Sequence, residues 1–355
     1  MNKDWDYLLN LQSSIFPQNQ NSEYFLNEWI KTKKGLLGED EDYKPADFCD
    51  AYDITIEQFY KLTGPSYKDL TNKKVIIEPF LKSLNLETFE KLKNVVLGTL
   101  PKISINAETY IGPYGAPIIV FHDGLIWLID HFKYIQTFRE EENHSEFSRK
   151  YYLDELRKLQ LIYLANGKQN EKLTRIQLSL ESLTKSTIQV QFIKLFVFAH
   201  EFAHIYLHHL ERNGKNELKK LSREILKEAQ NYNLDQVMEF EADELAYNWF
   251  EIFLKSESDL VNFAKEKQID FIKILPFELL YILNLFQAPL IINETDSAKK
   301  THPSTLDRLI RLYQLNKSNL NVREIQRIDE MILEAEKQVF IFTTAKKLIQ
   351  DNNKH

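Results

Sequence analysis

The alternation of hydrophobic and polar positions predicts a mostly helical chain with one small β element. Between residues 102 and 122, segments rich in Ile and Val lie on both sides of a Gly-Pro-Tyr-Gly turn, which predicts two strands. We expect a helix after Asp123-Gly124 and another over roughly 146–165. The predicted fold class is therefore α+β, predominantly α.

Apolar positions at helical spacing continue through the second half of the chain. They predict a helix from Ile188 to Arg212 that stops at Asn213-Gly214, and a charged helix around 217–230. Another helix is expected with Asp235 as its N-cap. The last segment, roughly 321–349, is amphipathic and could pack on the core or mediate self-association.

These patterns divide the chain into three parts. Residues 1–95 alternate apolar and charged positions without a chemical motif, and we interpret them as a mostly helical cap or recognition layer. Residues 96–317 form the expected core, with 126–187 as an inserted helical region. Residues 318–355 are expected to form a C-terminal helix.

Composition narrows the classes of partner and the cellular location. The 355 residues carry a net charge of −7, so no basic surface points to nucleic acid or to anionic lipid. Cys49 is the only cysteine, which excludes an internal disulfide and favours a reducing cytoplasm. The most apolar stretch, Ile274 to Ile292, is interrupted by proline and polar residues, so we expect a buried helix and no stable membrane insertion. The oligomeric state stays open.

The strongest chemical signal is the HExxH motif of His200, Glu201 and His204, which lies in an otherwise apolar run. Histidines four residues apart share one helical face, so both rings can reach one zinc ion. A glutamate beside them can take a proton from water without being a ligand. A core helix with internally bonded histidines is the alternative, but burying three unpaired polar groups would be costly.

A second motif carries Glu239 and Asp243 one helical turn apart. A His₂Glu zinc site needs a third ligand from another element, and a nearby carboxylate can accept the free N–H of a ligating histidine. Glu239 is the expected ligand and Asp243 its neighbour, whereas Glu241 lies about 200° around the helix and is expected to face elsewhere. Taken alone, these acidic residues are most typical of a solvated helix face.

A third segment, Thr301-His302-Pro303, predicts a helix start with Thr301 or His302 as the cap. His302 could then lie on a loop over the site, although an incidental histidine at a helix start is the simpler interpretation. His208 and His209 follow the HExxH motif. A further histidine on the ligand face could touch substrate or bond to the site, but a capped surface residue near a helix end is the more typical interpretation.

Together these motifs resemble the gluzincin metallopeptidases of the CAAX-prenyl-protease and HtpX type. That family shows HExxH, a Glu-x-x-Ala-Asp helix and a Thr/Ser-His-Pro segment with an Arg six residues after its His. The matching residues are His200, Glu201 and His204, then Glu239, Ala242 and Asp243, then His302, Pro303 and Arg308. The family's Asn-Ala strand, Gly-rich turn and Gly-Leu element resemble Ile105-Asn106-Ala107 to Gly124-Leu125, so the resemblance spans roughly residues 100–315.

The resemblance implies a peptidase core with a small sheet beside the HExxH helix and one zinc ion per chain. Its ligands would be His200, His204 and Glu239, and Glu201 would be the general base. It further implies that Asp243 and Arg308 lie behind the ligands, that His302 helps to stabilise the oxyanion, and that the strand at Ile105 and Asn106 binds substrate.

Two departures separate this chain from the family. Residues 126–187 intervene before HExxH, and most members are membrane-embedded. A looser resemblance is to the phage-exclusion proteases of the Lit type, soluble HExxH enzymes that cut a host translation factor.

The predicted function is a zinc-dependent metalloendopeptidase that acts on a protein or peptide substrate. A latent or partner-triggered regulatory zinc protein is the alternative, either a defence or toxin protease with a single target or a non-catalytic sensor. A second alternative is a hydrolase that acts on a non-peptide amide.

Overall fold

The structure is a computed structural model, and its contacts divide the chain into two compact units. One comprises residues 1–191 with 257–264, and the other comprises 192–256 with 265–355. Most of the recognition layer predicted for residues 1–95 and the charged helix predicted around 217–230 lie outside the described residues. The described residues are 76–100, 104–112, 114–142, 145–164, 178–209, 234–289 and 303–352.

The first unit contains a three-stranded sheet in the order β1-β3-β2. The central strand β3 (Pro117–His122) pairs in parallel with β1 (Val96–Leu100) and antiparallel with β2 (Ala107–Ile111). The two strands predicted on either side of the glycine turn are confirmed, and Gly115 adopts the φ of +93° that the turn requires. The strand β1 was not predicted, because its five residues show no clear alternation.

Helices precede and follow this sheet in the chain. The helices α5 (Glu78–Ser83) and α6 (Leu86–Leu92) come before it. After β3 come α7 (Asp123–Glu141) and α8 (Glu146–Leu164), which confirm the two helices predicted there. The α7–α8 contact is aromatic, with the Phe138 and Tyr151 ring centroids 4.9 Å apart and edge to face.

The second unit contains only helices within its described part. The HExxH segment lies near the end of α9 (Leu180–Tyr206), whose residues from Phe192 onward belong to this unit. Phe196 of α9 meets Phe250 of α11 edge to face, with centroids 6.2 Å apart. The elements that follow α9 are α11 (Leu234–Leu254), α12 (Asp259–Glu266, most of which belongs to the first unit), η5 (Ile272–Ile274), α13 (Leu275–Gln287), α14 (Thr305–Asn316), η7 (Lys317–Asn319) and α15 (Val322–Asn352).

Three predicted helix boundaries are wrong. The helix α9 begins before Ile188 because Ser179 caps it, its Oγ accepting the Ser182 N–H at 3.1 Å. It ends at Tyr206, before Arg212, because His208 takes a left-handed backbone with φ of 56°. Asp235 is not an N-cap; it lies within the first turn of α11, where its charge still favours the helix N-terminus.

The apolar segment predicted as a buried helix is confirmed over α13. All but three of the residues of α13 are buried, and Pro276 fits in its first turn, where no backbone N–H bond is lost. Its buried carboxylate, Glu278, forms an ion pair with Arg327 of α15 at 3.2 Å. Within the described ranges, no helix combines the length and the apolar character needed to cross a membrane.

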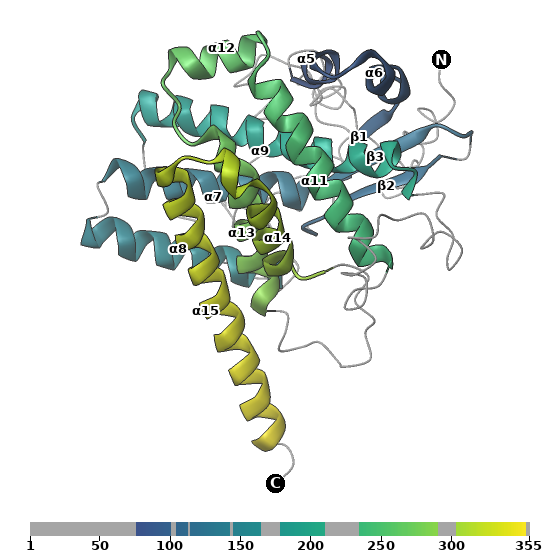
Figure 1. Cartoon of the computed structure of the whole chain (residues 1–355). Coiled ribbons are helices and arrows are strands. Elements are labelled where there is room, and N and C mark those ends of the chain that lie inside the picture. The colour runs from purple at the N-terminus through teal and green to yellow at the C-terminus, as the bar shows by residue number, and fades with distance from the viewer. Residues whose placement is uncertain are drawn as a thin grey trace, which may run out of the picture. The chain divides into compact units, whose positions relative to one another are not determined.

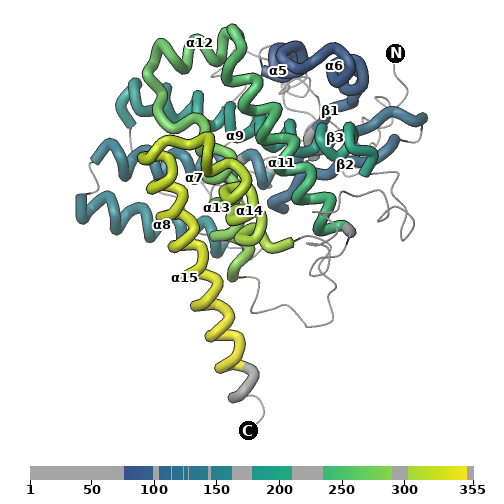
Figure 2. Tube along the Cα trace, in the orientation of Figure 1, coloured from purple at the N-terminus to yellow at the C-terminus, as the bar shows by residue number. Residues whose placement is uncertain are grey.

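The helix α14 lies beside both α11 and α13 (Figure 2), and this placement matters for the site. The helix α15 packs on α13 and α14 and then continues past the other helices of its unit (Figure 1). The amphipathic helix predicted over 321–349 is therefore confirmed, as is the predominantly helical α+β class with one small sheet. A role of α15 in self-association stays a prediction.

Candidate metal centre

Two helices of the second unit bring three potential metal ligands together. His200 and His204 come from α9, and their Nε2 atoms lie 3.1 Å apart. The carboxylate of Glu239, from α11, lies 3.4 Å from His200 Nε2 and 3.5 Å from His204 Nε2. These ligand atoms all lie within 4.8 Å of one another, so the three side chains could hold a metal ion. The HExxH and Glu239 predictions therefore meet at one point.

Packing between α9 and α11 explains why these three side chains meet. The HExxH residues lie on the final turns of α9, where Tyr206 contacts Trp249 of α11 edge to face at 5.4 Å. Phe196 and Phe250 make a second aromatic contact between the same two helices. On α9 these rings lie before and after the HExxH residues, so aromatic packing holds this part of the helix against α11 and the polar groups need not supply the packing energy themselves.

The chemistry of these donors fits a divalent cation. His200 Nδ1 lies 2.9 Å from Asp243, and a carboxylate only accepts hydrogen bonds, so this nitrogen carries the proton. When His200 is neutral, as a metal ligand must be, the lone pair of its Nε2 faces His204 Nε2 and a carboxylate. Acceptors gathered at such distances repel one another unless a cation lies among them, and two imidazoles with one carboxylate are typical zinc ligands.

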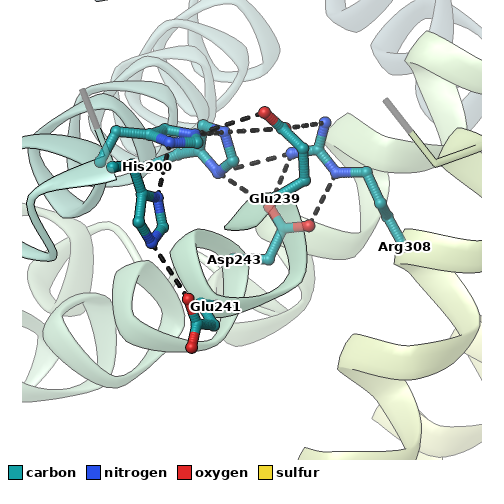
Figure 3. A network of polar contacts seen from close by, with 7 residues as sticks. His200, Glu239, Glu241, Asp243 and Arg308 are labelled. Atoms are coloured by element: carbon teal, nitrogen blue, oxygen red, sulfur yellow. Dashed lines mark hydrogen bonds and ion pairs between the residues drawn. The ribbon is translucent and has the colours of Figure 1, made fainter. Parts of the chain in front are cut away.

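Asp243 is held in turn by Arg308 of α14, whose side chain is 13% exposed. The guanidinium donates to both carboxylate oxygens of Asp243, with Nε and Nη2 each at 2.7 Å. Its Nη1 also lies 3.2 Å from Glu239. Figure 3 shows Arg308 reaching these two carboxylates from a separate helix. Arg308 therefore offsets the charge of a potential ligand and of the group behind it.

The start of α14 sets the position of Arg308. Ser304 caps the helix by accepting the Asp307 N–H at 3.0 Å, and its hydroxyl donates to the Asp307 carboxylate at 2.6 Å. The prediction that Thr301 or His302 would be the cap is wrong, since a serine just after the proline provides a better side-chain acceptor. His302 itself lies outside the described residues.

Two residues that the sequence placed elsewhere belong to this cluster. His209 Nδ1 lies 2.9 Å from His204 Nδ1, and His209 Nε2 lies 3.1 Å from Glu241. His209 is 5% exposed, so its interpretation as a surface residue is wrong. The expectation that Glu241 faces away is wrong as well, because it points toward His209. In Figure 3, Glu241 and Arg308 lie on different sides of the cluster.

The early end of α9 accounts for both errors. On a helix continued to Arg212, His209 would lie five residues after His204 and about 140° around the axis, out of reach. The left-handed His208 instead turns the chain back after Tyr206, and His209 folds against the preceding histidine. A positive φ at a non-glycine residue leaves no clear signal in sequence, so local patterns could not have found this contact.

His200 and His204 have opposite proton affinities in this structure. Burial disfavours charge on His200, but the neighbouring Asp243 carboxylate outweighs it and raises the pKa of His200 to about 10. Burial, followed by the charge on His200, lowers the pKa of His204 well below its usual value. Burial alone would raise the pKa of Asp243, yet the Arg308 guanidinium lowers it. The imidazole beside a carboxylate therefore holds the proton.

Glu201 is 7% exposed and follows His200 directly. Burial opposes the charge of Arg308, but Asp243, then Glu239 and Glu201, raise the pKa of Arg308, which places the Glu201 charge close to the cluster.

The predicted substrate residues lie in the first unit, just before β2. Asn106 accepts the His122 N–H through its backbone oxygen at 3.0 Å, and Ile105 is half-buried. Their role toward substrate stays a prediction.

Comparison with known proteins agrees with the chemistry of the cluster. Residues 192–331 match the family model described as Peptidase U49, which supports a peptidase. The match begins at the residue that opens the second unit and covers every residue of the cluster. Neither the curated proteins nor the solved structures give a match.

Proposed function

We propose that the chain is a zinc-dependent metalloendopeptidase of the gluzincin type. The ligands would be His200, His204 and Glu239, with one zinc ion per chain and a protein or peptide as substrate. The observation that carries the proposal is the convergence of these three donors within 4.8 Å, inside the range that matches a peptidase family.

Zinc, when bound, would supply Lewis acidity that polarises the scissile carbonyl and lowers the pKa of water. The remaining chemistry belongs to side chains. Glu201 would take the proton of the attacking water and deliver it to the leaving amine, a transfer that needs a carboxylate beside the ligands but not among them. The low exposure of Glu201 supports this assignment, since a buried carboxylate is shielded from bulk water.

The groups behind the ligands would fix their orientation. Asp243 would hold His200 with Nε2 directed at the metal, and Arg308 would keep Asp243 ionised and in place. In line with the gluzincin resemblance, His302 would help to stabilise the oxyanion. A substrate strand would add along the edge near Ile105 and Asn106.

The deciding experiment compares the zinc-loaded wild type with Glu201→Gln. New protein N-termini in a cell lysate are identified by mass spectrometry, and zinc is quantified in both samples. Glu244→Gln is the matched control, because Glu244 is an exposed carboxylate on α11. We expect both variants to bind one zinc ion, and we expect new termini with wild type and Glu244→Gln only.

Two results would contradict the proposal. If the Glu201→Gln variant cleaves as fast as wild type, the assigned general base is wrong. If wild type binds zinc but produces no new termini, the latent or partner-triggered alternative takes the place of a constitutive peptidase.

A further inference from the structure

The outer side of His204 is occupied by a pair of side chains that the mechanism above does not use. We call His209 and Glu241 the His209–Glu241 pair. The His204 and His209 rings meet edge to face with centroids 4.9 Å apart. The His209 side chain is 2% exposed and that of Glu241 is 16% exposed, so both contacts are largely shielded from water. Burying these groups is costly unless each one is hydrogen-bonded.

Only one arrangement of protons satisfies both the His209–Glu241 contact and the His209–His204 contact when Glu241 is ionised and His209 is neutral. The carboxylate only accepts, so His209 must donate to it from Nε2 over the 3.1 Å contact. A neutral His209 then has an unprotonated Nδ1, which accepts over the 2.9 Å contact with His204 Nδ1. His204 must therefore carry its proton on Nδ1, and its Nε2 keeps a lone pair.

That lone pair faces the cluster. His204 Nε2 lies 3.1 Å from His200 Nε2 and 3.5 Å from Glu239. The other neutral tautomer of His204 would put a proton on Nε2, which would occupy the position that a metal needs. It would also leave two bare Nδ1 atoms facing each other at 2.9 Å. The pair therefore disfavours that tautomer at Nδ1, where His209 contacts His204.

We infer that the His209–Glu241 pair positions His204 as a metal ligand, by fixing its tautomer and ring orientation across the turn that ends α9. The inference rests on the proposed function, because it takes His204 as a ligand. It extends that proposal, because it assigns to His204 a hydrogen-bonding support equivalent to the one that Asp243 gives to His200. Outer partners of ligating histidines commonly affect metal affinity by about 10- to 100-fold.

The test uses variants that separate hydrogen bonding from packing. His209→Leu fills similar space but neither accepts from His204 nor donates to Glu241. His209→Gln keeps one acceptor and one donor in a single side chain. Glu241→Leu and Glu241→Gln form a second set at the other residue, which keeps the test valid if a variant at His209 fails to fold.

The measurements are zinc affinity by chelator competition, metal stoichiometry, and the visible absorption spectrum of the cobalt-substituted full chain. We expect His209→Leu and Glu241→Leu to weaken zinc binding by about 10- to 100-fold and to alter the cobalt spectrum. The two Gln variants should stay within a few-fold of wild type. Glu244→Gln serves again as the control on α11.

Three results would overturn the inference. If the His209→Leu and Glu241→Leu variants match wild type in zinc affinity and cobalt spectrum, the pair does not support His204. The Gln variants could be as weak as the Leu variants, so that only packing matters. Wild type could bind two metal ions, one of which is lost in His209→Leu, so that the pair is itself a ligand set.

Failure of the proposed function gives a different pattern. If wild type binds zinc but cleaves nothing, the peptidase proposal fails while the order of affinities still decides the role of the pair. If wild type binds no zinc, both fail together.

Discussion

The two histidines of the cluster are supported on their outer sides in different ways. His200 meets the carboxylate of Asp243 directly, and Arg308 from another helix clamps that carboxylate through two bonds of 2.7 Å. His204 contacts a second imidazole, that of His209. The nearest carboxylate on this side, Glu241, contacts His209 and not His204. Both arrangements place an acceptor at Nδ1, but only the first places a negative charge there.

This difference separates orientation from charge. A directly bonded carboxylate orients its histidine and also stabilises the protonated ring, which accounts for the raised pKa of His200. An imidazole orients its neighbour without that electrostatic effect, and the pKa of His204 stays lowered by burial. A charged neighbour therefore orients His200, whereas a neutral hydrogen-bond acceptor that fixes the tautomer orients His204. Substitutions can disturb the two supports separately.

We call Asp243 and Arg308, which support His200, the charged side of the site, and His209 and Glu241, which support His204, the neutral side. The largest effect is expected from breaking the charged side with Arg308→Met. This change removes the guanidinium that contacts both Asp243 and Glu239, and removing one partner of a buried ion pair costs about 3–5 kcal/mol. We expect a loss of that size in the free energy of unfolding of the metal-free protein, measured by chemical denaturation. Zinc should restore part of it, because a cation returns to the carboxylates.

Arg327→Met is the matched control. Arg327 lies 3.2 Å from the buried Glu278, and its side chain is 30% exposed against 13% for Arg308, so we expect a smaller loss in the free energy of unfolding. Equal losses in the two variants would mean that the paired hydrogen bonds between Arg308 and Asp243 add nothing to stability.

The pH dependence of the metal-free protein sharpens the comparison further. His200 has a folded pKa of about 10 against an unfolded value of 6.5, so its contribution is complete below pH 6.5 and is lost as the pH rises toward 10. The pKa of His204 is lowered, so folding is penalised as the pH falls below 6.5. We expect maximal stability near pH 6.5, with slopes approaching about 1.4 kcal/mol per pH unit for one proton.

Asp243→Asn tests the origin of the alkaline slope. Because the charge of Asp243 raises the pKa of His200, its removal should flatten the decline between pH 6.5 and 10. Denaturation midpoints across this range, measured with a chelator present, provide the check. A wild-type protein that grows more stable from pH 6.5 to 10 would contradict the assignment.

Much of the charged side could be predicted from the sequence. HExxH fixes two histidines on one helical face, and Glu239 and Asp243 lie one turn apart on another, so local periodicity indicates which groups can meet. Arg308 was assigned through a resemblance that joins distant segments. The contacts of Arg308 with Asp243 and Glu239 depend on the packing of α14 beside α11, which local patterns do not indicate.

The contact of His209 with His204 on the neutral side could not be predicted from the sequence, and the reason is physical. Its contact depends on where α9 ends, and Asn213-Gly214 was a stronger helix stop by composition than Tyr206. The structure ends the helix through a left-handed His208, a conformation that tertiary contacts can impose on many polar residues. The strand β1 was missed similarly, since its pairing with β3 is set by the sheet and not by its own pattern.

A smaller effect is expected at the turn that carries the neutral side. His208→Val should destabilise the protein by about 1–2 kcal/mol, since a β-branched residue tolerates a φ of 56° poorly. It should also weaken zinc binding, because the turn positions His209. His208→Gly should keep both stability and affinity. Thermal unfolding and chelator competition measure the two quantities.

Gln268→Val is the control for the turn, because Gln268 has a similar φ of 49° outside the cluster. It should lower stability without changing zinc affinity. If His208→Val also leaves zinc affinity unchanged, the turn does not position His209.

The smallest effect is expected at Tyr247, one helical turn beyond Asp243 on α11. Tyr247 is fully buried against Phe277, and its hydroxyl has no hydrogen-bond partner among the residues that the structure describes. Tyr247→Phe removes this cost, so we expect stability to be unchanged or higher by up to about 1 kcal/mol at neutral pH.

Alkaline pH should enlarge the difference between Tyr247→Phe and wild type. Burial, aided by Glu251 and Glu324, raises the pKa of Tyr247, so above pH 10 the phenol ionises more readily in the unfolded chain. Wild type should then lose stability that the Phe variant keeps, as chemical denaturation at pH 7 and above pH 10 would measure. A clear loss in the Phe variant at neutral pH would instead reveal a partner for the hydroxyl, so that this position, like Asp243, would hold a satisfied buried polar group.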